Sequence, residues 1–215
     1  MASTSGKGGA GASCCCGGCG SLLAGGIVVL LYWASFQPHR IRAAVDSATL
    51  FNLTVVAAAA NANASSAAAA ALVSYRLAVN LTLYNPSVRV NIYYDTVYGE
   101  LRFRGAVLGG GAPASPSEFN QRRKTGDEVE LEFDRRGGVA VAADVAGELE
   151  KEAKGEGRVS LELDVDARVR YVFSIFKLRQ KPKIRCSLSI PVRAAAGRGG
   201  VGGALASGDR CRVKY

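Results

Sequence analysis

Apolar and polar residues alternate along much of the chain, which is typical of β-strands with one buried face. The longest alternating run covers residues 158–173, with apolar side chains at odd positions and charged ones at most even positions. Shorter runs with the same period cover residues 73–83, 88–94, 101–103 and 129–133. Because Asn-Pro, Gly and Ser-Pro signals separate these runs, the pattern predicts a mainly β protein built as an antiparallel β-sandwich.

One segment has helical spacing instead. Between Val139 and Lys154, apolar residues recur every four positions, and Gly155 follows as a stop signal. We therefore expect one short helix among the strands. Residues 57–71 are almost pure alanine with Asn and Ser and predict a low-complexity loop, whereas the Gly- and Ala-rich residues 194–208 give no structural prediction.

The amino-terminal part is apolar without alternation. From Gly8 to Gln37 the chain carries no charged side chain. Residues 17–36 match the roughly 20 apolar residues that span a bilayer core, so they predict a single transmembrane signal anchor. Residues 1–16 would then be a disordered cytosolic tail and residues 37–215 an extracytoplasmic domain. A cleaved signal peptide is the alternative, but its positive start is only Lys7 and no clean Ala-x-Ala site follows.

Three sequons lie beyond this segment and bear on its orientation. They begin at Asn52, Asn63 and Asn80, whereas the proline after Asn85 excludes a fourth. The flanking charges do not favour either side, so the sequons, together with the resemblance given below, predict that the carboxyl-terminal domain lies outside the cytosol.

The six cysteines fall into two groups. Cys14, Cys15, Cys16 and Cys19 crowd the cytosolic edge of the predicted anchor, where thiols are candidates for palmitoylation; filling an apolar helix end is the alternative. Two others, Cys186 and Cys211, lie in predicted strands with both side chains facing the core. We expect them to form a disulfide in an oxidising compartment, the alternative being two buried free thiols.

Charge adds one candidate surface. The chain has 27 Lys and Arg against 18 Asp and Glu, a formal net charge of +9. Five cations are spaced by two and would share one face of an extended segment: Lys177, Arg179, Lys181, Lys183 and Arg185. This basic row suits acidic cell-wall polysaccharide or anionic lipid, and it lacks the interleaved aromatics that nucleic acid would need. Protection of a sheet edge, favoured by Pro182, is the alternative.

The sequence contains no candidate residues for catalysis or for cofactor binding. His39 is the only histidine and adjoins the predicted anchor, so a Ser-His-Asp or Cys-His arrangement cannot form inside the domain. Glycine runs at 109–111 and 199–200 lack the Gly-Lys-Ser/Thr ending of a phosphate loop. We therefore expect a protein that is not an enzyme and holds no metal or cofactor.

Two segments resemble the signatures of a plant family. Residues 85–95, Asn-Pro-Ser-Val-Arg-Val-Asn-Ile-Tyr-Tyr-Asp, resemble the first signature of the harpin-induced and non-race-specific disease-resistance family, with Ser87 in place of the usual second Asn. Residues 181–192 are similar to its second signature, and residues 38–52 are similar to the stretch that leads out of its membrane anchor.

The resemblance implies a fold and a function. The fold is a late-embryogenesis-abundant type 2 domain, a β-sandwich of fibronectin type III-like shape with an accompanying helix. The function is that of a plasma-membrane glycoprotein with protein partners, a non-enzymatic interaction and signalling component in plant defence and stress responses. The alternative is a structural tether between membrane and cell wall, or a protectant during dehydration.

Overall fold

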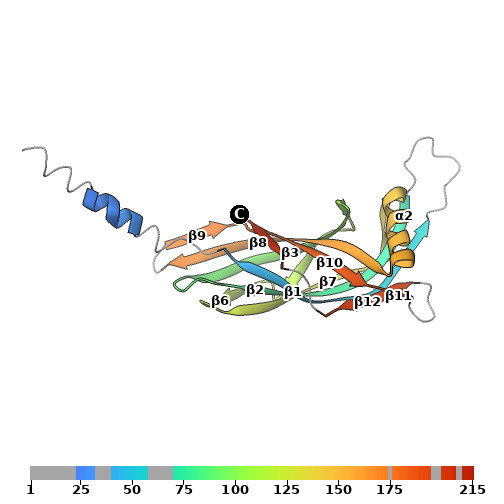
Figure 1. The fold of residues 1–215 in the computed structure, drawn as a ribbon, viewed down its shortest axis with the longest axis horizontal. Coiled ribbons are helices and arrows are strands. Elements are labelled where there is room, and N and C mark those ends of the chain that lie inside the picture. The colour runs from blue at the N-terminus through green and yellow to red at the C-terminus, as the bar shows by residue number, and fades with distance from the viewer. Residues whose placement is uncertain (1–22, 32–39, 58–69, 174–175, 195–199, 207–209) are drawn as a thin grey trace, which may run out of the picture. The chain divides into compact units, whose positions relative to one another are not determined.

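The structure is a computed structural model that describes residues 23–31, 40–57, 70–173, 176–194, 200–206 and 210–215 (Figure 1). The chain divides into two compact units, Met1–Pro38 and His39–Tyr215. The second unit holds all of the described strands and is called the β domain below.

The first unit contains one described helix, formed by residues 23–31. Its large apolar side chains, among them Leu23, Ile27 and Leu31, are exposed. Among the described residues no helix has the length and apolarity needed to cross a bilayer. The remaining residues of the predicted anchor, 17–22 and 32–36, lie outside the described part of the chain.

The β domain is mainly antiparallel sheet, as the alternation predicts. The strands are β1 (Arg42–Ala57), β2 (Ala70–Tyr84), β3 (Asn91–Phe103), β4 (Ala106–Val107), β5 (Ala112–Ser115), β6 (Phe119–Gln121), β7 (Gly126–Ala142), β8 (Arg158–Phe173), β9 (Phe176–Gln180), β10 (Lys183–Pro191), β11 (Arg193–Ala194), β12 (Val201–Leu205) and β13 (Arg212–Lys214). Most of the predicted low-complexity loop, residues 58–69, lies outside the described residues.

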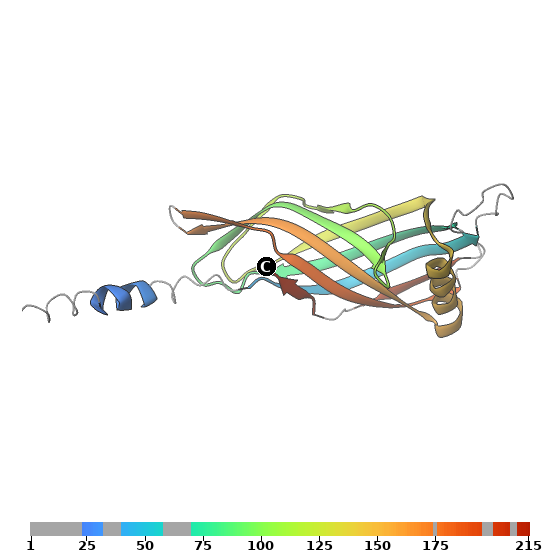
Figure 2. The same ribbon diagram turned by 90° about the horizontal axis from the view of Figure 1, so that it is seen from above.

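The strands form two sheet layers that are joined through β5. The order is β11-β12-β1-β2-β7-β5-β3-β8-β10-β13, and the short strands β4 and β6 pair with β3, while β9 pairs with β8. Figure 2 shows the long strands running side by side along the domain. Alternation is cleanest in β10, where every second residue from Ile184 to Ile190 is buried, so the inward faces share one apolar core.

The strand β1 is not visible in the hydrophobic pattern. It pairs with β2 from Arg42↔Tyr84 to Ala57↔Ala71, but the register shifts twice along its length. The shifts fall between Val45 and Ser47 and between Leu50 and Asn52. Since a bulge adds one unpaired residue, each shift breaks the period of two that marks a strand in the sequence.

The predicted helix begins later than its spacing suggested. Residues 139–142 continue strand β7, because Val139 and Val141 pair with β2. The helix α2 covers Ala143–Lys151 and runs into a π-helical turn, η1, over Glu152–Glu156. The mostly buried carboxylate of Glu152 fixes this turn by accepting hydrogen bonds from Arg104 at 3.0 Å and from the backbone of Ser160 at 3.2 Å.

Part of the Gly-rich segment that gave no prediction is strand β12. It pairs with β1 and contacts β10 of the other layer. A Cβ built on Gly203 would lie 1.8 Å from the carbonyl oxygen of Pro191, so only glycine allows this approach. The glycines of β12 hide this strand in the sequence, and they are also what allows the two sheet layers to approach each other on this side.

The predicted disulfide between Cys186 and Cys211 is confirmed, with the two Cα atoms 4.4 Å apart. It joins β10 to the segment before β13, whose Cys211 amide donates to Ala43 of β1 at 2.9 Å. The cross-link therefore holds the carboxyl-terminal segment where it bridges the two layers. Closing a loop of 25 residues stabilises a fold by about 3 kcal/mol.

Three buried tyrosines give the core its polar contacts. The Tyr75 hydroxyl donates to the Leu108 carbonyl, Tyr94 donates to Gln121 at 3.2 Å, and Tyr171 shares a hydrogen bond with Tyr215 at 3.1 Å. Burial raises the pKa of Tyr75 from 10.0 to about 12, although nearby Arg135 opposes the shift. Burial also raises the pKa of Tyr94 and of Tyr171.

We expect the β domain to lose stability as the pH rises from 10 to 12, because a raised tyrosine pKa stabilises the fold only while the phenol stays neutral. Urea unfolding across this range should show the free energy of unfolding falling less steeply for Tyr75→Phe than for the unmodified chain. Tyr98→Phe, which alters an exposed ring, is the matched control and should keep the original slope. Equal slopes for all three proteins would contradict the prediction.

Candidate functional site

The basic row predicted from the sequence lies on the outer face of the β8 layer. The strands β9 and β10 both pair with β8 and are separated by Lys181 and Pro182. A backbone hydrogen bond from Ala167 to Pro182 at 3.2 Å keeps the chain along β8 across this break. All five cations of the row are exposed, so the expectation of a shared outward direction is met.

Edge protection explains only part of the row. Lys177 and Arg179 belong to β9, which pairs with β8 alone and is an edge among the described strands. Lys183 and Arg185 are covered by β13, which pairs with them through Lys214 and Arg212. Since these two residues do not lie at an edge, their charge needs another role.

Acidic residues neutralise part of this face. Lys183 lies 3.7 Å from Asp166, and Arg185 lies 3.2 Å from Asp164, which also pairs with Arg102 at 3.4 Å. The side chains of Lys177, Arg179, Lys181 and Arg168 make no ion pair with any other described residue. The face therefore keeps a surplus of positive charge at the end nearer β9.

A hollow of about 580 Å³ opens on the same face between β3 and β10. Its polar lining is Thr96, Tyr98, Asp166, Arg168, Lys181 and Lys183. The ring of Tyr98 is 52% exposed, so cations and a half-open aromatic surface meet in one concave place. Such a lining can attract a carboxylate and offer an apolar surface to the body that carries it.

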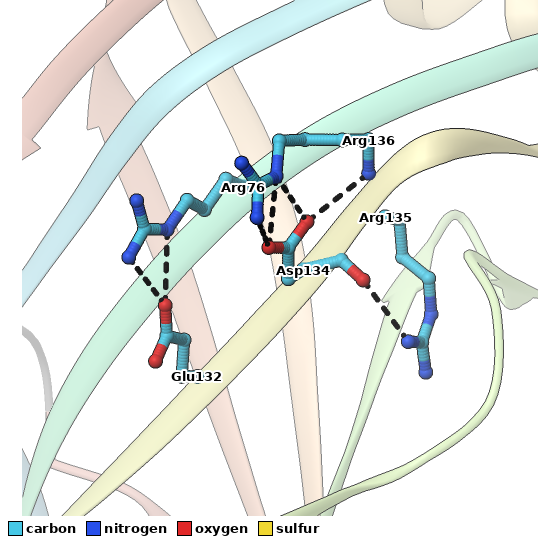
Figure 3. Close-up of polar contacts among 5 residues, drawn as sticks. All are labelled: Arg76, Glu132, Asp134, Arg135 and Arg136. Atoms are coloured by element: carbon cyan, nitrogen blue, oxygen red, sulfur yellow. Dashed lines mark hydrogen bonds and ion pairs between the residues drawn. The ribbon is translucent and has the colours of Figure 1, made fainter.

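The outer face of the other layer is different because its charges pair with one another (Figure 3). Arg76 binds Glu132 at 2.7 Å, and Arg136 binds Asp134 through both carboxylate oxygens at 2.9 Å. Hydrogen bonding from Arg136 lowers the pKa of Asp134. Arg135 donates to two backbone carbonyls, that of Asp134 at 3.1 Å and that of Gly110 at 2.6 Å. Both carboxylates of this cluster are ion-paired, and only Arg135 has no acidic partner among the described residues, so the cluster keeps a smaller surplus of positive charge than the basic row.

A buried asparagine, Asn85, organises one end of the domain. Its side-chain amide donates to the carbonyls of Val90 at 2.9 Å and Arg122 at 3.1 Å, and its carbonyl accepts from the Ser87 amide at 3.0 Å. The Ser87 hydroxyl then accepts from the Val90 amide at 3.2 Å. Asn85 thus joins the β2–β3 loop to the β6–β7 turn, a role that sequence analysis did not find.

The other predicted site residues are spread over the chain. Asn80 is exposed on the outer face of β2, and Asn52 is partly buried with its side-chain carbonyl without a hydrogen-bond partner among the described atoms. The remaining sequon, Asn63, lies outside the described residues. So do the four amino-terminal cysteines, Cys14, Cys15, Cys16 and Cys19.

Two curated proteins of Arabidopsis thaliana are similar to the chain. NDR1/HIN1-like protein 3 is 26% identical over 77% of this chain and 66% of its own length, and NDR1/HIN1-like protein 2 is 28% identical over 80% of this chain and 65% of its own length. The chain is similar to the NDR1/HIN1-like proteins. This confirms the family resemblance carried by the two signature segments. The matches span about two thirds of the length of these relatives.

Two further comparisons add no argument. No protein-family model matches the chain, so the late-embryogenesis-abundant type 2 assignment stays a prediction. The crystal structure of a protein from Archaeoglobus fulgidus aligns with a TM-score of 0.29 and 10% sequence identity. The alignment covers 68% of the present chain and 99% of the Archaeoglobus chain.

The first signature of this family is structural in the chain. Residues 85–90 form the Asn85-centred turn, and the rest of the signature opens β3, where Tyr94 stacks on Phe119 with the ring centroids 4.3 Å apart. Ser87, which replaces the usual second Asn, keeps a capping acceptor in the turn.

Replacing the buried amide in Asn85→Ala should lower the free energy of unfolding by about 2 kcal/mol or more, because the Val90 carbonyl and the Ser87 amide lose a buried partner and the Arg122 carbonyl loses one of its two donors. Urea denaturation measures this change. Asn120→Ala, at an exposed position of neighbouring β6, is the control and should change the free energy little. A similar small effect at both sites would refute the organising role.

Proposed function

We propose that the chain is a single-pass plasma-membrane protein whose β domain lies outside the cytosol and acts as a non-enzymatic interaction component in plant defence and stress responses. The relationship to NDR1/HIN1-like proteins supports the link to defence and stress. The observation that carries the location is the Cys186–Cys211 pair, because disulfides persist in oxidising compartments and are rare in the cytosol.

Membrane attachment rests on the uncharged segment from Gly8 to Gln37. An apolar stretch of this length is typical of a spanning helix. The three sequons fit the same orientation, and Asn80 has the exposure that a glycan requires. In this arrangement the short amino-terminal tail faces cytosolic partners, and its cysteines are candidates for acylation.

Recognition outside the cell is assigned to the hollow between β3 and β10. Its cations and the open ring of Tyr98 suit an acidic ligand, and its lining contains no histidine or cysteine. An interaction surface therefore fits this concavity better than a reaction centre does.

Protease protection of intact membranes, combined with glycosidase treatment, tests orientation and anchoring together. With the full chain expressed in plant cells, we expect external protease to remove the β domain and glycosidase to increase its gel mobility. Asn80→Gln should abolish part of the glycosidase shift, whereas Asn120→Gln, outside any sequon, is the control. A β domain that is protected from protease, unglycosylated and reduced at Cys186 and Cys211 would overturn the proposal.

Tethering to the cell wall is the second candidate function, favoured by the unpaired cations of the basic row. Polygalacturonate is a suitable probe because its carboxylates repeat along an extended chain. Replacing Arg168, Lys181 and Lys183 by serine should weaken binding of the detergent-solubilised full chain to polygalacturonate about tenfold, equal to about 1.4 kcal/mol.

The matched control replaces Lys151, Lys154 and Arg158 by serine and alters net charge by the same amount. It should leave polygalacturonate binding within about twofold of the unmodified chain, because the three positions lie far from the hollow. Equal losses in both triple variants would show that only net charge matters and would rule out a tethering site at the hollow.

A further inference from the structure

One end of the β domain gathers four segments that are distant in sequence. Strand pairing brings them together: Arg42 pairs with Tyr84, Tyr84 with Gly126, Asn91 with Val172, and Val172 with Lys177. We call residues 40–43, 85–90, 122–125 and 177–179 the proximal end, because the chain enters the domain there at Ile41. Figure 1 shows β9 at this end and α2 at the opposite end of the domain.

The proximal end is strongly basic. Its four segments contain no acidic residue and eight exposed cations: Arg40, Arg42, Arg89, Arg122, Arg123, Lys124, Lys177 and Arg179. Apart from Arg89, none of these side chains has an ion pair or hydrogen bond with another described residue. The opposite end is less basic, since α2 and η1 carry Asp144, Glu148, Glu150 and Glu152 against Lys151 and Lys154, with Arg104 paired to Glu148 and Glu152.

Apolar side chains accompany the cations. Val88, at the tip of the β2–β3 loop, is 57% exposed, and Leu178 of β9 is 44% exposed. Val88 adjoins Arg89 in the sequence, and Leu178 lies between Lys177 and Arg179 in the sequence but on the opposite face of β9. Aliphatic groups flanked by Lys and Arg are the composition of surfaces that enter the headgroup layer of a membrane.

Hydrogen bonds hold the segments of the proximal end in place. Asn85 bonds to Val90 and Arg122, so the loop with Val88 and the turn with Arg122–Lys124 share one buried anchor point. The Ile41 amide donates to the Tyr215 hydroxyl at 2.8 Å, and Tyr215 contacts Tyr171 beside β9. Two separate sets of hydrogen bonds therefore fix the backbone that carries most of these cations, one centred on Asn85 and one on Tyr215.

Chain length brings this end close to a membrane if the anchor is inserted. Only a few residues separate Phe36, the last of the predicted anchor, from Ile41. A fully extended link of that length spans at most about 17 Å. If the anchor is inserted, this short link therefore keeps the proximal end nearer to the headgroups than any other part of the domain.

We propose that the proximal end docks on anionic phospholipid headgroups, so that the β domain stands upright on its own membrane with α2 pointing away. This inference rests on the membrane anchoring proposed above. Attraction of the eight cations holds the end at the surface, and Val88 and Leu178 enter the headgroup layer. The hollow between β3 and β10 then faces sideways, clear of the lipid and open to ligands from the wall.

The test places a fluorophore at Val88→Cys in the full chain, with Cys14, Cys15, Cys16 and Cys19 replaced by serine. The labelled protein is reconstituted into phosphatidylcholine vesicles with or without phosphatidylserine, each containing headgroup-level nitroxide lipid as a quencher. We expect strong quenching in anionic vesicles only, and its loss at high salt. A fluorophore at Ala143→Cys, exposed at the start of α2, should remain unquenched throughout.

Serine at Arg42, Arg122, Arg123 and Lys124 should lower the ratio of docked to undocked domain about 1,000-fold and restore fluorescence at Val88→Cys. Serine at Lys151, Lys154, Arg158 and Arg193 removes the same charge at other places and should leave quenching intact.

Four results would overturn the docking. The first is equal quenching in neutral and anionic vesicles, and the second is equal quenching at Val88→Cys and Ala143→Cys. The third is an equal effect of the two quadruple variants. The fourth is quenching that added polygalacturonate relieves but that does not depend on phosphatidylserine. Retention after an alkaline wash is measured on the same vesicles. Retained protein without anionic quenching refutes the docking alone, whereas protein washed off refutes the anchoring.

Discussion

The register of β8 against its two neighbours is the constraint on which the rest of the domain depends. Leu163 pairs with Leu101 on one side and Cys186 on the other, so all three point inward, while Asp164 and Arg185 point outward together. A shift of one residue would turn every apolar side chain of β8 to solvent and every charge to the core. The buried face therefore fixes the charged face, and the hollow with its cations exists because the core admits no other alignment.

The second organising element is polar. Asn85 is fully buried and bonded at its side-chain nitrogen and oxygen, and Gln121 binds both Tyr94 and the Leu83 carbonyl nearby. Buried amides without partners are costly, so these contacts specify loop conformations that apolar packing alone would leave free. The segment that resembles the first family signature therefore serves mainly to hold backbone in place.

Much of the fold could be predicted from the sequence, and the failures have physical causes. The strands β2, β8 and β10 keep a period of two and are predicted by it, as is the pairing of Cys186 with Cys211. The strands β3 and β7 are predicted only in part, because β3 is bulged between Tyr94 and Thr96 and the end of β7 has helical spacing. The bulges of β1 and the glycines of β12 removed the signal there. For the surface, spacing gave the outward cations of β9 and β10. It could not reveal that Arg122–Lys124 lie at the same end of the domain as Arg42, since that placement arises only through the pairing of β1, β2 and β7.

The long pairing of β1 with β2 has a mechanical consequence. Beginning at Arg42↔Tyr84, it runs the length of both strands to Ala57↔Ala71. A force that pulls Ile41 away from α2, at the opposite end of the domain, acts along the strands and would load these backbone hydrogen bonds in shear, all at once. Such a geometry resists mechanical unfolding better than one in which the bonds open one after another.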